Sequence, residues 1–118
     1  MGKGKSIIQQ KSFMFALDVI ELYKQLVEQK EFVLSKQLLR SGTSIGANVE
    51  EASAGQSKKD FIAKMSIASK EARETHYWLR LIEESKVGNV NSNELLLKCG
   101  ELINILTAIV KTSQQNNS

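Results

Sequence analysis

No proline interrupts this chain of 118 residues, and that absence constrains its fold more than any other feature. Proline breaks helix interiors and commonly marks loops, so a chain without it favours long uninterrupted helices. Only seven glycines are present to help form turns. Apolar residues also recur three and four positions apart along most of the sequence, which is the spacing of a helix with a buried face. We therefore predict an all-α protein with few turns.

The first two predicted helices are joined by the short polar segment 29–31. Ser6 and Gln9 have the spacing of a capping box, so the first helix begins there. Its apolar positions follow helical spacing at 13, 16, 17, 20, 23 and 27, and further apolar residues leave only a narrow polar strip. The second helix begins near Phe32 or Val33 without a clear cap, and Gly55 is interpreted as the helix-ending glycine. The core strip of the second helix is predicted to be Leu34, Leu38, Ile45, Val49 and Ala52.

The third and fourth helices have the most regular patterns. Ser57 and Asp60 form a second capping box, from which a helix of about 28 residues, or roughly 42 Å, runs to Ser85. The pair Asn91 and Glu94 predicts a cap for the fourth helix. The predicted core positions are Phe61, Met65, Ala68, Ala72, Thr75, Leu79 and Ile82 on the third helix, and Leu95, Cys99, Leu102, Leu106 and Ile109 on the fourth.

Four helices of about 20–28 residues joined by short loops predict an antiparallel up-down-up-down four-helix bundle. The length suits one domain spanning residues 1–118, with flexible tails at 1–5 and about 113–118. The first and fourth helices carry more apolar surface than one bundle interior requires, and contiguous apolar patches mark interfaces. We therefore expect a homo-oligomer.

Composition limits where such a protein acts. The formal charge of +3 and the pI near 9.0 permit a polyanionic partner without requiring one. A single cysteine, Cys99, rules out an intramolecular disulfide, and the N-terminal residues lack the apolar run of a signal peptide. No apolar stretch of about 18–20 residues is free of charge, so no membrane span is predicted. We expect a cytoplasmic protein.

The segment 40–54 is built mostly from side chains no larger than serine. Gly42 and Gly46 each weaken a helix by about 1 kcal/mol relative to alanine, which indicates that another helix packs closely there. We predict that this neighbour is the third helix. Polar residues on the two helices are predicted to form a structural network that fixes their register, with Glu71 and Glu74 bonding Asn48, Ser44 or an arginine. The predicted network is Ser44, Asn48, Glu51, Glu71 and Glu74.

Enzymatic sites are disfavoured. A carboxylate-bridged di-metal centre in a helical bundle needs Glu-x-x-His pairs, but His76 is the one histidine and Arg73 stands three residues before it. No glycine-rich phosphate loop precedes a Lys-Ser/Thr pair, and no Ser-His-Asp set suggests a triad. Cys99 falls in a core strip, which is typical of a buried structural thiol. We predict no catalytic, cofactor-binding or metal-binding residues.

Basic residues on the second and third helices are the candidates for contact with nucleic acid: Lys36, Arg40, Lys58, Lys59 and Lys64. Each alone is more typical of a solvated surface, and a monomer would not concentrate them. A ring of several copies would repeat each cluster and raise the local potential. His76, beside Tyr77 and Trp78, could stack on a base, although aromatic residues at this spacing are more typical of core or interface positions.

The segment Ser-Gly-Thr-Ser-Ile-Gly-Ala-Asn-Val-Glu-Glu-Ala at 41–52 resembles a bacterial family of four-helix bundles, the 23S rRNA intervening-sequence proteins. The resemblance continues through residues 59–68 and the pattern Glu71-x-x-Glu74-x-x-Tyr77-Trp78-Leu79. It implies a closed, often pentameric, ring of four-helix bundles without enzymatic activity. The chain is also similar to the accessory proteins of diversity-generating retroelements, which are basic pentamers that contact nucleic acid and a reverse transcriptase.

Two functions are consistent with these features. The first is a non-catalytic homo-oligomer, most simply a pentamer, that associates with RNA or DNA. The second is a structural or protein-interaction module that acts through a ring without nucleic acid. A sequence preference on nucleic acid, or the identity of a protein partner, cannot be predicted from these residues.

Overall fold

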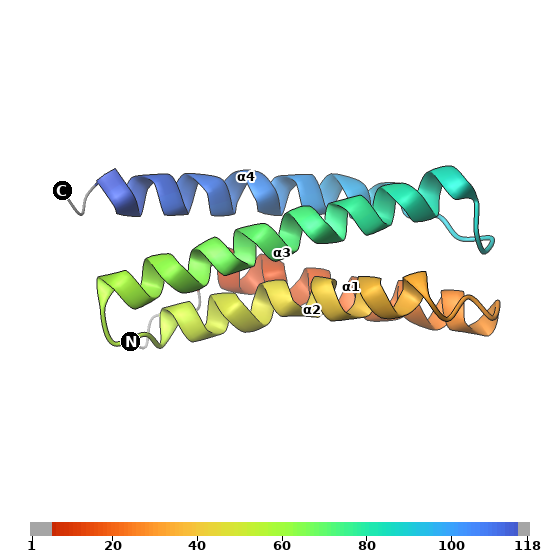
Figure 1. Cartoon of the computed structure of the whole chain (residues 1–118), viewed down its shortest axis with the longest axis horizontal. Coiled ribbons are helices and arrows are strands. Elements are labelled where there is room, and N and C mark those ends of the chain that lie inside the picture. Colours follow the sequence, from red (N-terminus) through yellow and green to blue (C-terminus); the bar gives the residue numbers. More distant parts are fainter. Residues whose placement is uncertain (1–5, 116–118) are drawn as a thin grey trace.

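The computed structural model describes residues 6–115, which form four α-helices: α1 (Ile7–Glu28), α2 (Leu34–Ser53), α3 (Lys58–Ser85) and α4 (Asn93–Gln115). Consecutive helices run in opposite directions along the long axis (Figure 1). α1 packs against α2 and α4, and α3 also packs against α2 and α4, so α1 and α3 lie on a diagonal of the bundle. The predicted all-helical fold with four helices is confirmed.

The starts of α1 and α3 follow the predicted capping residues. Ser6 Oγ accepts the N–H of Gln9 at 3.3 Å, and the Gln9 side chain accepts the N–H of Ser6 at 3.0 Å. At the start of α3, Ser57 Oγ accepts the N–H of Asp60 at 3.1 Å. α2 has no side-chain cap at Val33, but the Glu31 carboxylate accepts the N–H of Ser35 at 2.9 Å. An acidic residue upstream therefore satisfies a donor that no typical capping residue covers.

Three predicted boundaries are corrected by the structure. Ala54 caps α2, and Gly55 does not adopt the left-handed conformation expected of a helix-ending glycine; Lys86 adopts it after α3, with φ 60°. α4 begins at Asn93, whose N–H is accepted by the Asn91 side chain at 3.0 Å. α4 also continues to Gln115, past residue 113 where a tail was expected. The predicted tail residues 1–5 and 116–118 lie outside the described residues.

The interior is formed largely by the predicted strips. On α2, α3 and α4 nearly all of the predicted core positions are buried, whereas Leu34, Phe61 and Ile109 near the helix ends are half-buried. A hydrogen bond of 2.9 Å joins the buried hydroxyls of Ser41 on α2 and Thr75 on α3. Thr75 also bonds the Glu71 carbonyl at 2.8 Å, and because a carbonyl can only accept, Ser41 supplies the proton between the hydroxyls.

The apolar residues of α1 lie on more than one side of the helix, as predicted. Its buried residues are Ile8, Ser12, Phe15, Val19, Leu22 and Leu26, whereas Phe13 and Leu17 are 60% and 44% exposed. α1 is apolar around most of its circumference, so the spacing of its apolar residues matches more than one face. The neighbouring helices decide which face is buried.

The two glycines within α2 face α1 rather than α3. A Cβ atom on Gly42 would lie 2.8 Å from Val19 Cγ1, and one on Gly46 would lie 3.4 Å from the Ser12 carbonyl oxygen. The predicted close approach is therefore correct, but the predicted neighbour is wrong. α3 is reached instead by the adjacent residue Ser41, through Thr75.

Candidate nucleic-acid interface

Arg40, a predicted nucleic-acid contact, is neutralised by two carboxylates of α3. One guanidinium nitrogen lies 3.4 Å from a Glu71 oxygen, and the other is paired with Glu74. Trp78 Nε1 donates to the same Glu74 carboxylate at 3.0 Å. The prediction that Glu71 and Glu74 bond an arginine is confirmed. Because this cluster ties α2 to α3, Arg40 has a structural role that competes with binding a phosphate.

Lys64 is likewise engaged within the bundle. Its ammonium lies 2.8 Å from the Glu51 carboxylate on α2, and this hydrogen bond raises the pKa of Lys64 above its ordinary value. Glu51 therefore links α2 to α3 as predicted. Asn48 does not: its side chain donates to the Ser44 carbonyl at 2.9 Å, within α2 itself.

The remaining predicted contacts are exposed but far apart. Lys58 and Lys59 begin α3 beside the α2–α3 turn, whereas Lys36 lies in the first turn of α2, at the opposite end of the bundle (Figure 1). The five predicted basic residues therefore form no single patch on one chain. Two of them are paired with carboxylates, and the other three are split between the two ends.

Another group of cations, which was not predicted from the sequence, lies on α3 and α4. Lys70, Arg73 and Arg80 are exposed on α3, and Lys111 is exposed on α4. None of the four forms an ion pair with any residue in the range 6–115. Arg73 donates to the Thr107 hydroxyl on α4 at 3.1 Å. Their spacing along α3 was visible in the sequence, but the direction in which nearby carboxylates turn was not.

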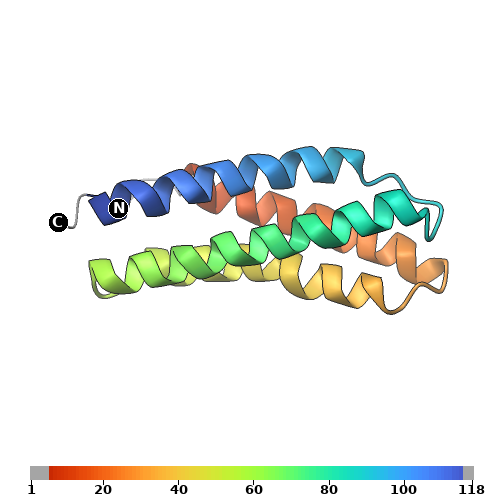
Figure 2. The same ribbon diagram turned by 45° about the horizontal axis from the view of Figure 1, so that its top comes forward.

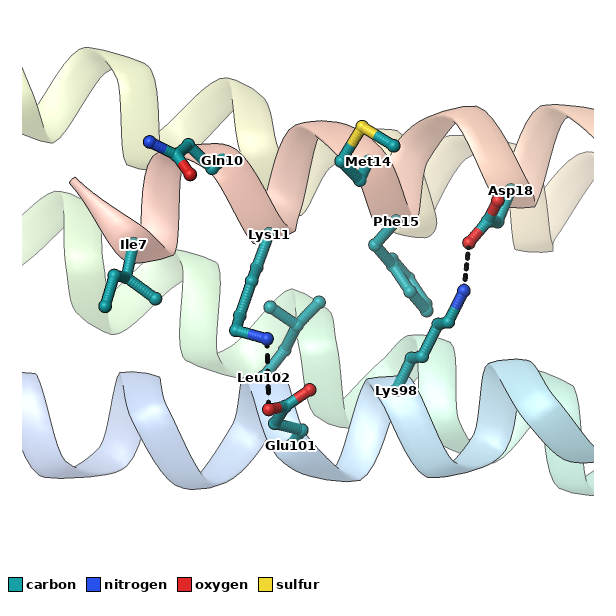
Figure 3. A pocket seen from close by; sticks show the side chains of 9 residues that line it. All are labelled: Ile7, Gln10, Lys11, Met14, Phe15, Asp18, Lys98, Glu101 and Leu102. Atoms are coloured by element: carbon teal, nitrogen blue, oxygen red, sulfur yellow. Dashed lines mark hydrogen bonds and ion pairs between the residues drawn. The ribbon is translucent and has the colours of Figure 1, made fainter. Parts of the chain in front are cut away.

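A groove of about 410 Å³ runs between α1 and α4 (Figure 3). Phe15 points from α1 toward α4, while Ile7 and Met14 on α1 are 66% and 59% exposed. Two ion pairs cross the groove, Lys11 with Glu101 at 3.1 Å and Lys98 with Asp18 at 2.8 Å. The bond to Asp18 raises the pKa of Lys98. The complete lining is Ile7, Gln10, Lys11, Met14, Phe15, Asp18, Lys98, Glu101 and Leu102.

The groove continues into an exposed apolar surface on α1, which we call the α1 apolar face: Ile7, Phe13, Met14 and Leu17. Each of these side chains is at least 44% exposed. Contiguous apolar groups of this kind mark interaction surfaces rather than ordinary solvated helices. The excess apolar surface predicted for the first helix is therefore present.

The residues considered for chemistry have other surroundings. Cys99 is buried as predicted, with its sulfur 3.2 Å from the Ala72 carbonyl oxygen, and burial raises the thiol pKa to about 12. Within residues 6–115, no three His, Cys, Asp or Glu side chains are grouped closely enough to hold a metal ion. No helix in the same range has both the length and the apolarity to cross a membrane.

The family model described as 23S rRNA-intervening sequence protein matches residues 4–108. The chain belongs to this family. This chain is similar to the crystal structure of a protein of unknown function from Bacteroides thetaiotaomicron, a member of the S23 ribosomal protein family. The TM-score is 0.83 and the sequence identity is 47%. The similarity covers 89% of this chain and 96% of the other. A search of curated proteins found no match. The resemblance to 23S rRNA intervening-sequence proteins is therefore confirmed.

Proposed function

We propose that this protein is a non-catalytic homo-oligomer of the cytoplasm that associates with RNA or another nucleic acid. The observation that carries the proposal is its membership of the 23S rRNA-intervening sequence protein family, matched over residues 4–108. The basic pI of about 9.0 and the group of unpaired cations on α3 and α4 support a polyanionic partner.

The α1 apolar face supports assembly into an oligomer. Its exposed residues Ile7, Phe13 and Met14 would lose contact with water against another copy, which is favourable at about 25 cal/mol per Å² of apolar area. The charges beside them are already paired across the groove, so a partner would not leave them unsatisfied. We propose that the oligomer is a closed ring and specifically a pentamer, as the family resemblance implies.

Assembly would strengthen an otherwise modest electrostatic attraction. One chain carries a formal charge of +3, which is a mild bias for 118 residues. A closed ring repeats every basic cluster around one axis, so a long polyanion could contact several copies at once. Several weak contacts, one set from each chain, would together give the affinity that the proposed function requires.

The experiment is a filter-binding titration with structured RNA across a salt series, with the oligomer mass measured on the same sample by light scattering. We expect an oligomer that retains RNA at low salt and releases it as salt rises, because phosphate contacts displace counterions. An absence of RNA and DNA retention at low salt would contradict the proposal. A monomeric mass would contradict its oligomeric part.

The second candidate is a protein-interaction module without nucleic acid. The groove of about 410 Å³ between α1 and α4 favours it, because an apolar groove can receive an apolar helix of a partner. The same titration separates the two functions. A stable oligomer that retains no nucleic acid at low salt supports the second.

A further inference from the structure

We propose that a single-stranded segment of nucleic acid binds to the outer face of α3 and the adjoining edge of α4. This surface, which we call the α3 basic face, comprises Lys70, Arg73, Tyr77, Arg80 and Lys111. The inference rests on the proposed association with nucleic acid. It places the charged contacts on cations other than those predicted from the sequence.

The first argument is the direction of the nearby carboxylates. Glu71 and Glu74 alternate with the cations along α3, yet both turn toward α2, where they pair with Arg40. On α4, Glu101 turns toward α1 and pairs with Lys11. The bundle therefore separates these three acids from the α3 basic face. The exposed Glu84 lines a pocket with Tyr77 and Arg80, but within residues 6–115 it forms no ion pair with a cation of this face. An uncompensated cation attracts a phosphate without first breaking an ion pair.

The second argument is the spacing of the side chains. Lys70, Arg73, Tyr77 and Arg80 follow one another at intervals of three, four and three residues, which places them along one side of α3. The ten residues from Lys70 to Arg80 extend about 15 Å along the helix axis. The three cations of α3 therefore form a strip along which a phosphate backbone could lie.

The third argument is the polar groove beside these cations. Arg73 reaches across to Thr107, and Lys111 lies one turn further along α4. The groove has a volume of about 260 Å³, and hydroxyl and amide groups line it together with the two cations. Such groups donate hydrogen bonds to phosphate and sugar oxygens in protein–nucleic acid complexes. Its lining is Ser66, Ser69, Arg73, Thr107, Val110, Lys111 and Gln114.

Tyr77 provides an aromatic group between the cations. It is 53% exposed, and its ring packs edge-on against Trp78, with the ring centroids 5.4 Å apart. Trp78 donates a hydrogen bond to Glu74, and this bond holds in place the ring against which Tyr77 packs. An exposed aromatic ring within a cationic strip is the combination that binds single strands, because unpaired bases stack on it.

The α3 basic face also remains accessible in the proposed oligomer. α3 lies diagonally across the bundle from α1, and Figure 2 shows α3 in front of α1 with α2 and α4 on either side. A closed ring needs two different contacting surfaces on each copy. Where the α1 apolar face meets the apolar side of α4, on which Leu97 is 77% exposed, the outer side of α3 stays free. Each copy could contribute its cations to the same polyanion.

The charge test compares two triple variants with the same change in net charge. Lys70→Gln/Arg73→Gln/Arg80→Gln removes three cations of the α3 basic face, and Lys36→Gln/Lys58→Gln/Lys59→Gln removes three other exposed cations. Binding of a labelled single-stranded RNA of about 20 nucleotides is measured by anisotropy between 50 and 300 mM salt. We expect the first variant to lose more than tenfold in affinity and its salt slope to fall by about 2, at roughly 0.7 per phosphate contact. We expect the second to lose less than threefold.

The outcomes separate this inference from the proposed function. If the wild-type protein binds and the two triple variants weaken binding equally, the α3 basic face is wrong while the association with nucleic acid stands. If the wild-type protein binds no RNA or DNA at low salt, both fail. Unchanged circular dichroism and unchanged oligomer mass show that each variant has folded.

The stacking test uses Tyr77→Leu with Tyr77→Phe as its matched control. We expect Tyr77→Leu to weaken single-stranded RNA binding about fivefold or more, and Tyr77→Phe to bind like the wild type, because stacking needs the ring and not its hydroxyl. Single-stranded DNA of the same sequence should respond in the same way, whereas duplex RNA should not. Equal losses for Tyr77→Leu on single-stranded and duplex RNA would overturn the single-stranded assignment.

Discussion

Gly42 is the residue at which one added methyl group would disturb the bundle most directly. Its Cβ would lie 2.8 Å from Val19 Cγ1, and Val19 is fully buried, so α1 or the Val19 side chain must move. Overpacking of this kind costs about 1–3 kcal/mol, against about 1 kcal/mol that alanine gains over glycine within a helix. We expect Gly42→Ala to lower the free energy of unfolding by about 1 kcal/mol in urea denaturation.

Gly100 is a matched control for Gly42, because it lies within α4 and no atom would approach its Cβ within 4 Å. Gly100→Ala should therefore raise the free energy of unfolding by about 0.5–1 kcal/mol. Val19→Ala removes the obstructing methyl groups, so adding Gly42→Ala to that variant should no longer destabilise the protein. A Gly42→Ala protein as stable as the wild type would contradict the close contact.

At the residue scale, the sequence indicated where helices pack closely but not which helices. The small side chains of residues 40–54 allow close approach, and this holds for whichever helix lies opposite. Gly42 faces α1 and its neighbour Ser41 faces α3, because adjacent residues point about 100° apart around a helix. Only the three-dimensional arrangement assigns a partner to each side of α2.

At the scale of elements, Glu83 links the end of α3 to the start of α4. Its carboxylate accepts the hydroxyl of the buried Ser92 at 2.7 Å and the Ser92 N–H at 3.3 Å, and these bonds lower the pKa of Glu83. A lowered folded-state pKa stabilises the protein above the unfolded pKa of about 4.3, and this stabilisation is lost as pH falls through the folded value. We expect Glu83→Gln to be less stable than the wild type at pH 7, with the difference shrinking between about pH 5 and 3.

The measurement for Glu83 is the urea midpoint of both proteins at intervals from pH 7 to 3. Glu84→Gln is the control, because it removes the adjacent exposed carboxylate without touching Ser92. Its stability should follow the wild type through the acid range. A constant difference between wild type and Glu83→Gln at every pH would mean that the charge of Glu83 is not what stabilises the connection.

The helices differ in how well their sequences predicted their faces. α3 and α4 each carry one apolar strip at alternating spacings of four and three, and nearly all of those positions are buried. α1 is apolar on several sides, so its sequence did not show which of its apolar residues would be buried and which, like Phe13 and Leu17, would be exposed. The α3 basic face could not be predicted from the sequence for a related reason. Glu71 and Glu74 lie among its cations in the sequence, and only their pairing with Arg40 removes them from that surface.

At the scale of the whole molecule, two opposite surfaces of the bundle have different chemistry. α1 presents exposed apolar side chains, and α3, on the same diagonal, presents uncompensated cations. Joining copies through α1 would bring several basic faces onto one polyanion. Linked sites of this kind can exceed the affinity of a single site by about 10²–10⁴-fold without any new contact. Loss of assembly should therefore weaken binding to a long RNA more than binding to a short one.

Phe13→Glu tests this arrangement directly. Phe13 is 60% exposed in the α1 apolar face, so the substitution should leave the bundle folded, while a buried unpaired carboxylate would oppose contact between copies. We expect a smaller mass by light scattering, unchanged helicity, and an affinity that falls at least tenfold for RNA of about 100 nucleotides but little for RNA of about 10.

Ile67→Glu is the matched control, because Ile67 is also exposed and apolar but lies on α3. It should keep the oligomer mass and the preference for long RNA, since α3 is not expected to contact another copy. If Phe13→Glu retained the wild-type mass, the α1 apolar face would not be the interface. If it became monomeric yet bound long RNA as tightly as the wild type, repetition of the α3 basic face would not be the source of affinity.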